Sequence, residues 1–129
     1  MLFTDTITIS YVGASTSTST ITESANLRSA FDDSIPDSTT NQEITISCRT
    51  AGLKSARFVS DAAVTLKTNS TTADDTIILV ADVPRLYAED GEVGAIPFTT
   101  TNDITSIFVS NASGGAAHLQ IDLLYDGTP

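Results

Sequence analysis

The chain has 129 residues, enough for one domain of ordinary size. Its 16 Asp and Glu residues outnumber its 6 Lys and Arg residues, so the formal net charge at pH 7 is -10. Tryptophan is absent and one cysteine occurs. These values argue against a nucleic-acid binder, a domain stapled by disulfides and an aromatic sugar-binding platform.

The same composition bears on membranes and on the redox state of the thiol. No apolar run reaches the roughly 18 residues that a membrane-spanning helix needs, and we expect no secretory signal at the start of the chain. The acidic charge disfavours adhesion to an anionic bilayer. Cys48 follows Ile44 and Ile46 at strand spacing, which predicts a buried small side chain rather than a reactive thiol. We therefore expect neither a nucleic-acid nor a membrane partner.

The first part of the chain alternates with a period of two. Ile7, Ile9 and Tyr11 are separated by Thr and Ser residues, as in a half-buried strand. Residues 14–21 consist mainly of alternating serine and threonine, which predicts an edge strand with two polar faces.

Residues 22–33 are the one segment that predicts a helix. Thr22 is a suitable N-cap, and Leu27 and Phe31 are four residues apart on what would be one helical face. Residues 34–42 contain proline, aspartate and asparagine, which predict a loop.

Short strands with turn signals between them are predicted for the rest of the chain. They cover residues 43–49, 55–60, 63–68, 76–81, a short segment around 86–87, 104–110 and 117–125. The run 76–81 is continuously apolar, which predicts burial on both faces. The predicted fold is all-β: a single β-sandwich domain over residues 1–129, with about eight to ten short antiparallel strands and at most one short helix. The jelly roll is one topology that fits this pattern.

The sequence offers little catalytic chemistry. His118 is the one histidine, and it lies out of phase with the apolar residues of its strand, so we expect it to face solvent or a subunit contact. No nucleophile, phosphate-loop or zinc-binding motif occurs. Acidic clusters at 32–33, at 89–92, and at Asp74 and Asp75 with Asp82 could hold calcium, but none has EF-hand spacing. We predict no enzyme activity, no metal site and no cofactor.

What remains is a surface that binds another protein. Residues 1–5 could form a contact arm, and the segment 85–98 could supply a second contact, since Arg and Tyr are enriched at interface centres. The candidate contact residues are Leu2, Phe3, Arg85, Tyr87 and Phe98. The alternative is that Leu2, Phe3, Leu86 and Tyr87 complete the core of the domain itself.

Four segments resemble small structural proteins of tailed bacteriophages, among which several are capsid decoration (cement) proteins. They are 61–69 (DAAVTLKTN), 74–77 (DDTI), 98–100 (FTT) and 104–114 (ITSIFVSNASG), and the similarity extends over roughly residues 35–126. The resemblance implies a small β-sandwich or jelly roll that binds the major capsid protein on the outer surface of the virion. It also implies a homotrimer that stabilises contacts between capsomers after assembly in the bacterial cytoplasm.

Three other readings stay open at this point. The chain could be a tail, baseplate or fibre subunit, because β-sandwiches serve there too. It could be a carbohydrate- or calcium-dependent binding module. It could also be a hydrolase, although the motif search argues against this.

Overall fold

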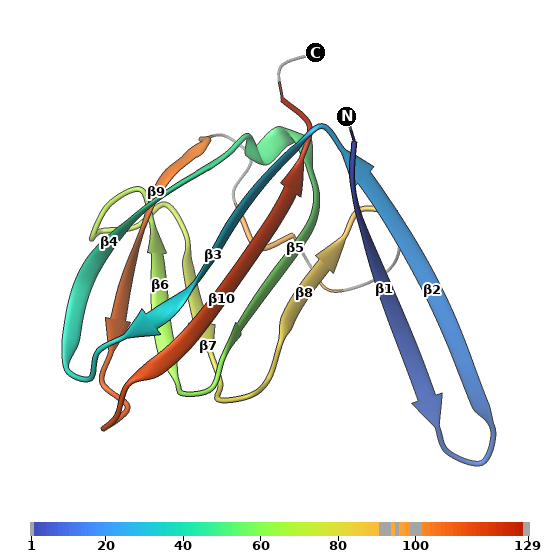
Figure 1. Cartoon of the computed structure of the whole chain (residues 1–129), viewed down its shortest axis with the longest axis horizontal. Coiled ribbons are helices and arrows are strands. Elements are labelled where there is room, and N and C mark those ends of the chain that lie inside the picture. The colour runs from blue at the N-terminus through green and yellow to red at the C-terminus, as the bar shows by residue number, and fades with distance from the viewer. Residues whose placement is uncertain (1, 91–93, 95, 99–101, 128–129) are drawn as a thin grey trace.

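A computed structural model describes residues 2–90, 94, 96–98 and 102–127. The described residues form ten strands and one 3-10 turn, in agreement with the predicted all-β class (Figure 1). The N-terminal strands are β1 (Phe3–Val12), β2 (Thr16–Ala25), β3 (Leu27–Ile35) and β4 (Thr39–Cys48). After the turn η1 (Thr50–Gly52) come β5 (Leu53–Ser60), β6 (Val64–Thr68), β7 (Thr76–Leu79), β8 (Arg85–Ala88), β9 (Ile104–Asn111) and β10 (Ala117–Tyr125). No helix among the described residues is long and apolar enough to cross a membrane.

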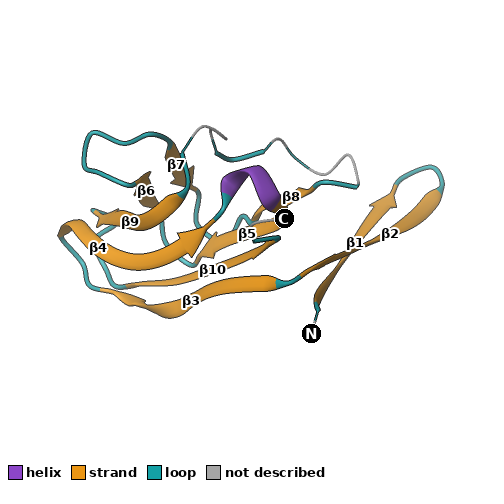
Figure 2. Cartoon of the chain, turned by 90° about the horizontal axis from the view of Figure 1, so that it is seen from above, coloured by secondary structure: helices purple, strands orange, loops and turns teal. Residues whose placement is uncertain are grey.

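Eight of these strands form a sandwich of two four-stranded sheets, in the orders β3-β10-β5-β8 and β4-β9-β6-β7 (Figure 2). The pairing is nested: β3 pairs with β10, β4 with β9, β5 with β8 and β6 with β7, all antiparallel. One long antiparallel hairpin wound around a core gives this pattern, which is the jelly-roll topology. The β-sandwich prediction is confirmed, and its jelly-roll form is the one observed.

The core lies between the two sheets and comes from alternate residues of their strands. Leu119, Ile121 and Leu123 of β10 face Ile107 and Val109 of β9 across the interior. Cys48 also belongs to this core, as its spacing predicted. Burial raises the pKa of its thiol to about 12, so the group stays protonated and inert.

The helix predicted for residues 22–33 is wrong. The segment contains the end of β2 and most of β3, and β3 pairs with β10 along its whole length, from Leu27 opposite Tyr125 to Ile35 opposite Ala117. Ser, Thr, Asn and Asp in this segment have low helix propensity, so nine residues of sheet pairing with β10 outweigh one helical apolar stripe.

Two further boundaries differ from the prediction. The loop expected over 34–42 is only a turn between Ile35 and Thr39, with Ser38 in the left-handed region at φ 62°. The run 76–81 is not buried on both faces, because β7 is an edge strand that ends at Leu79. Ile77 and Leu79 point into the core, whereas Ile78 is 68% exposed.

Asn111 fixes the corner where β9 ends. The side chain is fully buried, and its Nδ2 donates to the carbonyl oxygens of Ile35, Pro36 and Gly115 at 3.0, 3.2 and 3.0 Å. Its Oδ1 accepts hydrogen bonds from the backbone N–H and the hydroxyl of Ser113. One amide group thereby satisfies polar groups from both strands at one end of the β3–β10 pair.

Replacing Asn111 by alanine should lower the free energy of unfolding by about 2–4 kcal/mol, because it leaves several buried polar groups without partners. Urea denaturation measures the change. The exposed Thr45→Ala, on β4, is the matched control and should change stability by less than about 0.5 kcal/mol. An Asn111→Ala variant as stable as the control would contradict this role.

Candidate functional site

The most distinctive part of the surface is a hairpin formed by β1 and β2. The two strands pair antiparallel over ten positions, from Phe3 opposite Ala25 to Val12 opposite Thr16, and form a two-stranded sheet of their own. Figures 1 and 2 show this hairpin projecting from the edge of the sandwich, with its tip well away from the body. Within residues 1–5, predicted as a contact arm, Phe3 to Asp5 form the start of this hairpin; Met1 lies outside the described residues.

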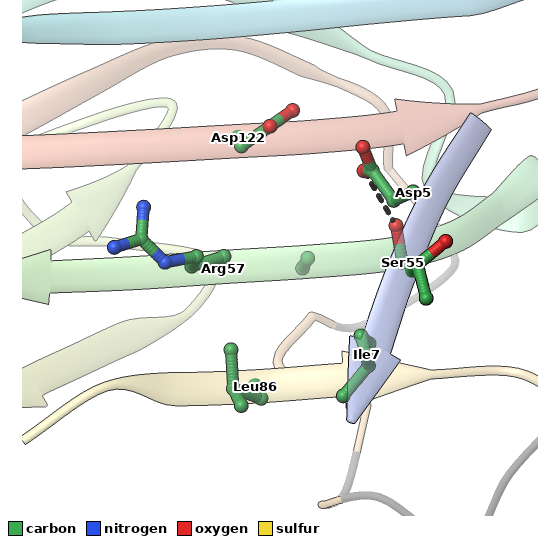
Figure 3. Close-up of a pocket in the computed structure, with 8 residues that line it drawn as sticks. Asp5, Ile7, Ser55, Arg57, Leu86 and Asp122 are labelled. Carbon is green, nitrogen blue, oxygen red and sulfur yellow. Dashed lines mark hydrogen bonds between the residues drawn. The ribbon is translucent and has the colours of Figure 1, made fainter. Parts of the chain in front are cut away.

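Charged and hydroxyl groups hold the base of the hairpin on the outer face of the β3-β10-β5-β8 sheet. Arg28 of β3 pairs with Asp5 of β1, and its Nε lies 3.4 Å from Oδ1 of Asp122 on β10. The hydroxyl of Ser55 donates to Oδ2 of Asp5 at 3.1 Å (Figure 3). The guanidinium of Arg28 also lies over the Phe3 ring, 5.5 Å from its centroid. Side chains from four strands thus meet at this base.

A small cleft of about 140 Å³ lies between the hairpin base and the sheet. Figure 3 shows Asp5 and Ile7 on one side, with Ser55, Arg57, Leu86 and Asp122 on the sheet side. Burial raises the pKa of Asp122 above its ordinary value of 3.8, and the nearby Asp5 carboxylate raises it further. Arg28 and Arg57 act in the opposite direction on this pKa. The two carboxylates therefore repel each other across the arginine that binds both.

Glu23 provides a second anchor for the hairpin. Its side chain is 2% exposed, and its Oε2 accepts a hydrogen bond from the backbone N–H of Asp90 at 2.6 Å. Burial raises the pKa of this carboxyl group, while the backbone hydrogen bond from Asp90 lowers it. The backbone N–H of Asn26, at the junction with β3, donates a hydrogen bond to Oδ1 of Asp126, just after β10, at 3.1 Å. The base is consequently also fixed at the end of β2 and at its junction with β3.

The outer part of the hairpin is uncharged and exposed. Between Asp5 and Glu23 the sequence contains no Asp, Glu, Lys, Arg or His, and residues 8–20 are all exposed. Ile9 and Tyr11 continue the face that carries Phe3 and Ile7 at the base, but here the face is exposed. Ile9, Tyr11 and Val12 are 42%, 66% and 78% exposed. We call these three side chains the hairpin tip.

A glycine shapes the hairpin tip. The ring of Tyr11 lies over Gly13, where an added Cβ would come within 2.9 Å of a ring carbon. The tyrosine can pack against its own turn because this position has no side chain. It still presents most of its ring to solvent.

The structure separates the contact residues predicted from the sequence. Leu2 is exposed and Phe3 is half-buried at the hairpin base, while Arg85 is exposed at the start of β8. Tyr87 is partly buried against the core. Phe98 is 4% exposed and packs edge-on against Phe58 at 5.8 Å between ring centroids. Phe98, predicted as a contact residue, is therefore part of the core.

The hairpin tip itself was absent from the predicted contact residues. The signal was present in the sequence, because Ile9 and Tyr11 alternate with polar residues in a stretch without charge. That alternation is typical of a half-buried strand, so the pattern predicted an internal partner. Burial by the same chain reaches only as far as Ile7.

Where the structure describes them, the other candidate groups are not brought together into a site. His118 is exposed and pairs with Asp32. Asp74 accepts hydrogen bonds from the side-chain amides of Asn69 and Asn102, whereas Asp82 lies on a different loop, its N–H bonded to the Ser60 carbonyl. Among the residues that the structure describes, no group of three His, Cys, Asp or Glu side chains could hold a metal ion. Residues 91–93 and 95, within the predicted segment 85–98 and acidic cluster 89–92, lie outside the described residues.

Comparison with known proteins found no matching family model, no matching curated protein and no matching solved structure. The surface therefore has to be interpreted from its own geometry. Its main features are an acidic body, a fixed hairpin base and an uncharged, exposed tip.

The cluster at the hairpin base predicts a pH dependence of stability. Because the pKa of Asp122 is higher in the folded protein than in the unfolded chain, its contribution to stability is complete below pH 3.8 and is lost as the pH rises through the raised pKa. Asp122→Asn removes this titration. The free energy of unfolding of the wild type, relative to that of Asp122→Asn, should increase as the pH falls from neutral toward 3.8.

Urea denaturation at a series of pH values measures this difference. Thr20→Ala, on the exposed part of the hairpin, is the control, and its difference from the wild type should not depend on pH. A difference between wild type and Asp122→Asn that is independent of pH, or that decreases on acidification, would contradict the assignment.

Proposed function

We propose that this protein is a structural virion protein, a capsid decoration or cement protein. It binds the major capsid protein on the outer surface of a phage head and stabilises the contacts between capsomers. The observation that carries the proposal is the uncharged hairpin that projects from an acidic jelly-roll body.

The charge of the body supports a position outside the shell. A protein with a formal net charge of -10 is repelled by packaged DNA and has few cations with which to bind phosphates. On the outer surface the same charge keeps the particles soluble and apart. The protein therefore acts on the protein lattice and not on the nucleic acid.

The hairpin supports a role in docking. An isolated two-stranded hairpin is at best marginally stable in water, and the outer part of this one, residues 8–20, is exposed throughout. Exposed Ile, Tyr and Val side chains at its end can be buried by a neighbouring subunit. An arm of this kind lets one subunit hold on to another across a lattice.

Symmetry would strengthen such a contact. A homotrimer presents three copies of each docking surface, so a modest interface binds with a high effective concentration. Jelly rolls are frequent among viral shell proteins, which supports the proposal at the level of the fold only. The single buried cysteine suits assembly in the host bacterial cytoplasm, where disulfides are rare.

The test is to titrate the purified protein onto phage heads that lack it. We expect saturable binding at a fixed ratio to the capsid protein and better survival of the heads on heating and osmotic shock. The double variant Tyr11→Asp/Val12→Asp should bind at least about tenfold more weakly, because it places charge on the hairpin tip. Thr45→Asp, exposed on β4 and distant in sequence from the tip, is the matched control.

Two outcomes would contradict the proposal. Heads whose survival is unchanged at saturation would remove the stabilising role. Gold-labelled protein located at the tail rather than on the head would assign the chain to a tail, baseplate or fibre subunit.

A further inference from the structure

A second uncharged surface lies at one end of the β4-β9-β6-β7 sheet. It is a shallow groove of about 240 Å³, and no ionisable side chain lines it. Ile78 of the edge strand β7 stands on one side, with Thr65 of β6 and Ser110 of β9 beside it in register. Ala112 and Ser113, from the turn after β9, close the end. We call this surface the β7 groove.

The edge strand beside the β7 groove is short and carries no charged side chain or proline. Natural edge strands are commonly blunted by charged side chains or proline, because their free backbone groups can pair with another chain. Strand β7 has neither, and among the described residues it pairs with β6 alone. Ile78 is 68% exposed, and the exposed Val80 follows directly after the strand. An apolar edge of this kind is typical of a surface that a partner covers.

Charge limits what that partner can be. Two copies of a chain with a formal net charge of -10 repel each other wherever their acidic surfaces approach within the screening length of about 8–10 Å. The hairpin tip and the β7 groove are both uncharged and both apolar. They are thus surfaces through which one copy can approach another without bringing carboxylates together. The hydroxyl groups of Thr65 and Ser110 can also hydrogen-bond a tyrosine hydroxyl.

The tip cannot fill the groove of its own molecule. Arg28, with Asp5 and Asp122, fixes the hairpin base on the outer face of the opposite sheet. Figure 1 shows the hairpin tip and the turn between β9 and β10 on the same side of the molecule, at the lower edge of the view and far apart. Contact between tip and groove therefore requires two molecules.

We infer that the hairpin tip of one copy inserts into the β7 groove of the next. The inference rests on the proposed role of the hairpin as a docking arm, and it names a second copy of this chain as the partner of the tip. The contact joins two different surfaces, so it is heterologous. The end of the hairpin and the turn after β9, whose Ala112 and Ser113 line the groove, lie on the same side of the molecule, so a rotation about an axis running toward that side can close the copies into a ring.

Cysteine cross-linking tests the contact. The native Cys48 is buried and its pKa is raised to about 12, so introduced thiols are the reactive ones. Tyr11→Cys protein is mixed with Ile78→Cys protein and oxidised, and we expect a disulfide-linked heterodimer as the main product. The control mixture pairs Tyr11→Cys with Thr45→Cys, which is exposed on the far edge strand of the same sheet. Equal yields of heterodimer from both mixtures would overturn the inference. So would a predominant homodimer linked through the introduced cysteines at position 11 of two copies.

Sedimentation equilibrium gives an independent readout without cysteine. Ile78→Asp should weaken self-association by at least about tenfold, whereas Thr45→Asp should leave it unchanged. Circular dichroism confirms that both variants are folded, as expected for exposed positions. A wild-type chain that is monomeric but binds heads through its tip overturns this inference and leaves the proposed function standing. A chain that cross-links from tip to groove but does not bind phage heads overturns the proposed function and leaves the contact between copies standing.

Discussion

Arg28 lies between two carboxylates from distant parts of the chain, and the direction of the hairpin depends on it. Asp5 enters from β1 and Asp122 from β10, so the guanidinium joins the arm to the sheet that supports it. Without a cation there, two acidic groups would face each other in a partly buried cleft. The same arginine packs over Phe3, which adds an apolar contact to the ionic one. The contacts proposed for the hairpin tip require the hairpin base to stay bound to the sheet.

The distribution of charge gives the surface its second constraint. Acidic residues occur over the body but are missing from the outer hairpin and from the lining of the β7 groove. In a strongly acidic protein an uncharged surface is one where another acidic surface can come close without electrostatic cost. The polar faces of β2 are consistent with this, since serine and threonine keep the arm soluble without adding charge.

The jelly-roll topology determines which edges are left open. Nested pairing places β7 and β8 at one end of their sheets and β3 and β4 at the other. The hairpin base covers part of the outer face of one sheet, whereas the outer face of the other sheet stays open around Ile78. The outer faces of the two sheets therefore present different surfaces. A subunit with two different surfaces is suited to heterologous contacts, in which one surface binds the other. The fold supplies this asymmetry without specifying an activity.

The sequence alone determined the all-β class, the alternation of β10 and the burial of Cys48, because a period of two and a continuous set of turn signals are local properties. It did not determine the partner of each strand. Residues 22–33 carry a weak helical stripe, and only pairing with β10 makes most of them a strand. Ile9 and Tyr11 show the pattern of a half-buried strand, yet the body ends before it reaches them. Phe98 was expected at a contact surface and is buried, whereas Ile78 was expected in the core and is exposed. Whether an apolar residue is buried depends on which distant strand covers it, and this is decided by tertiary packing.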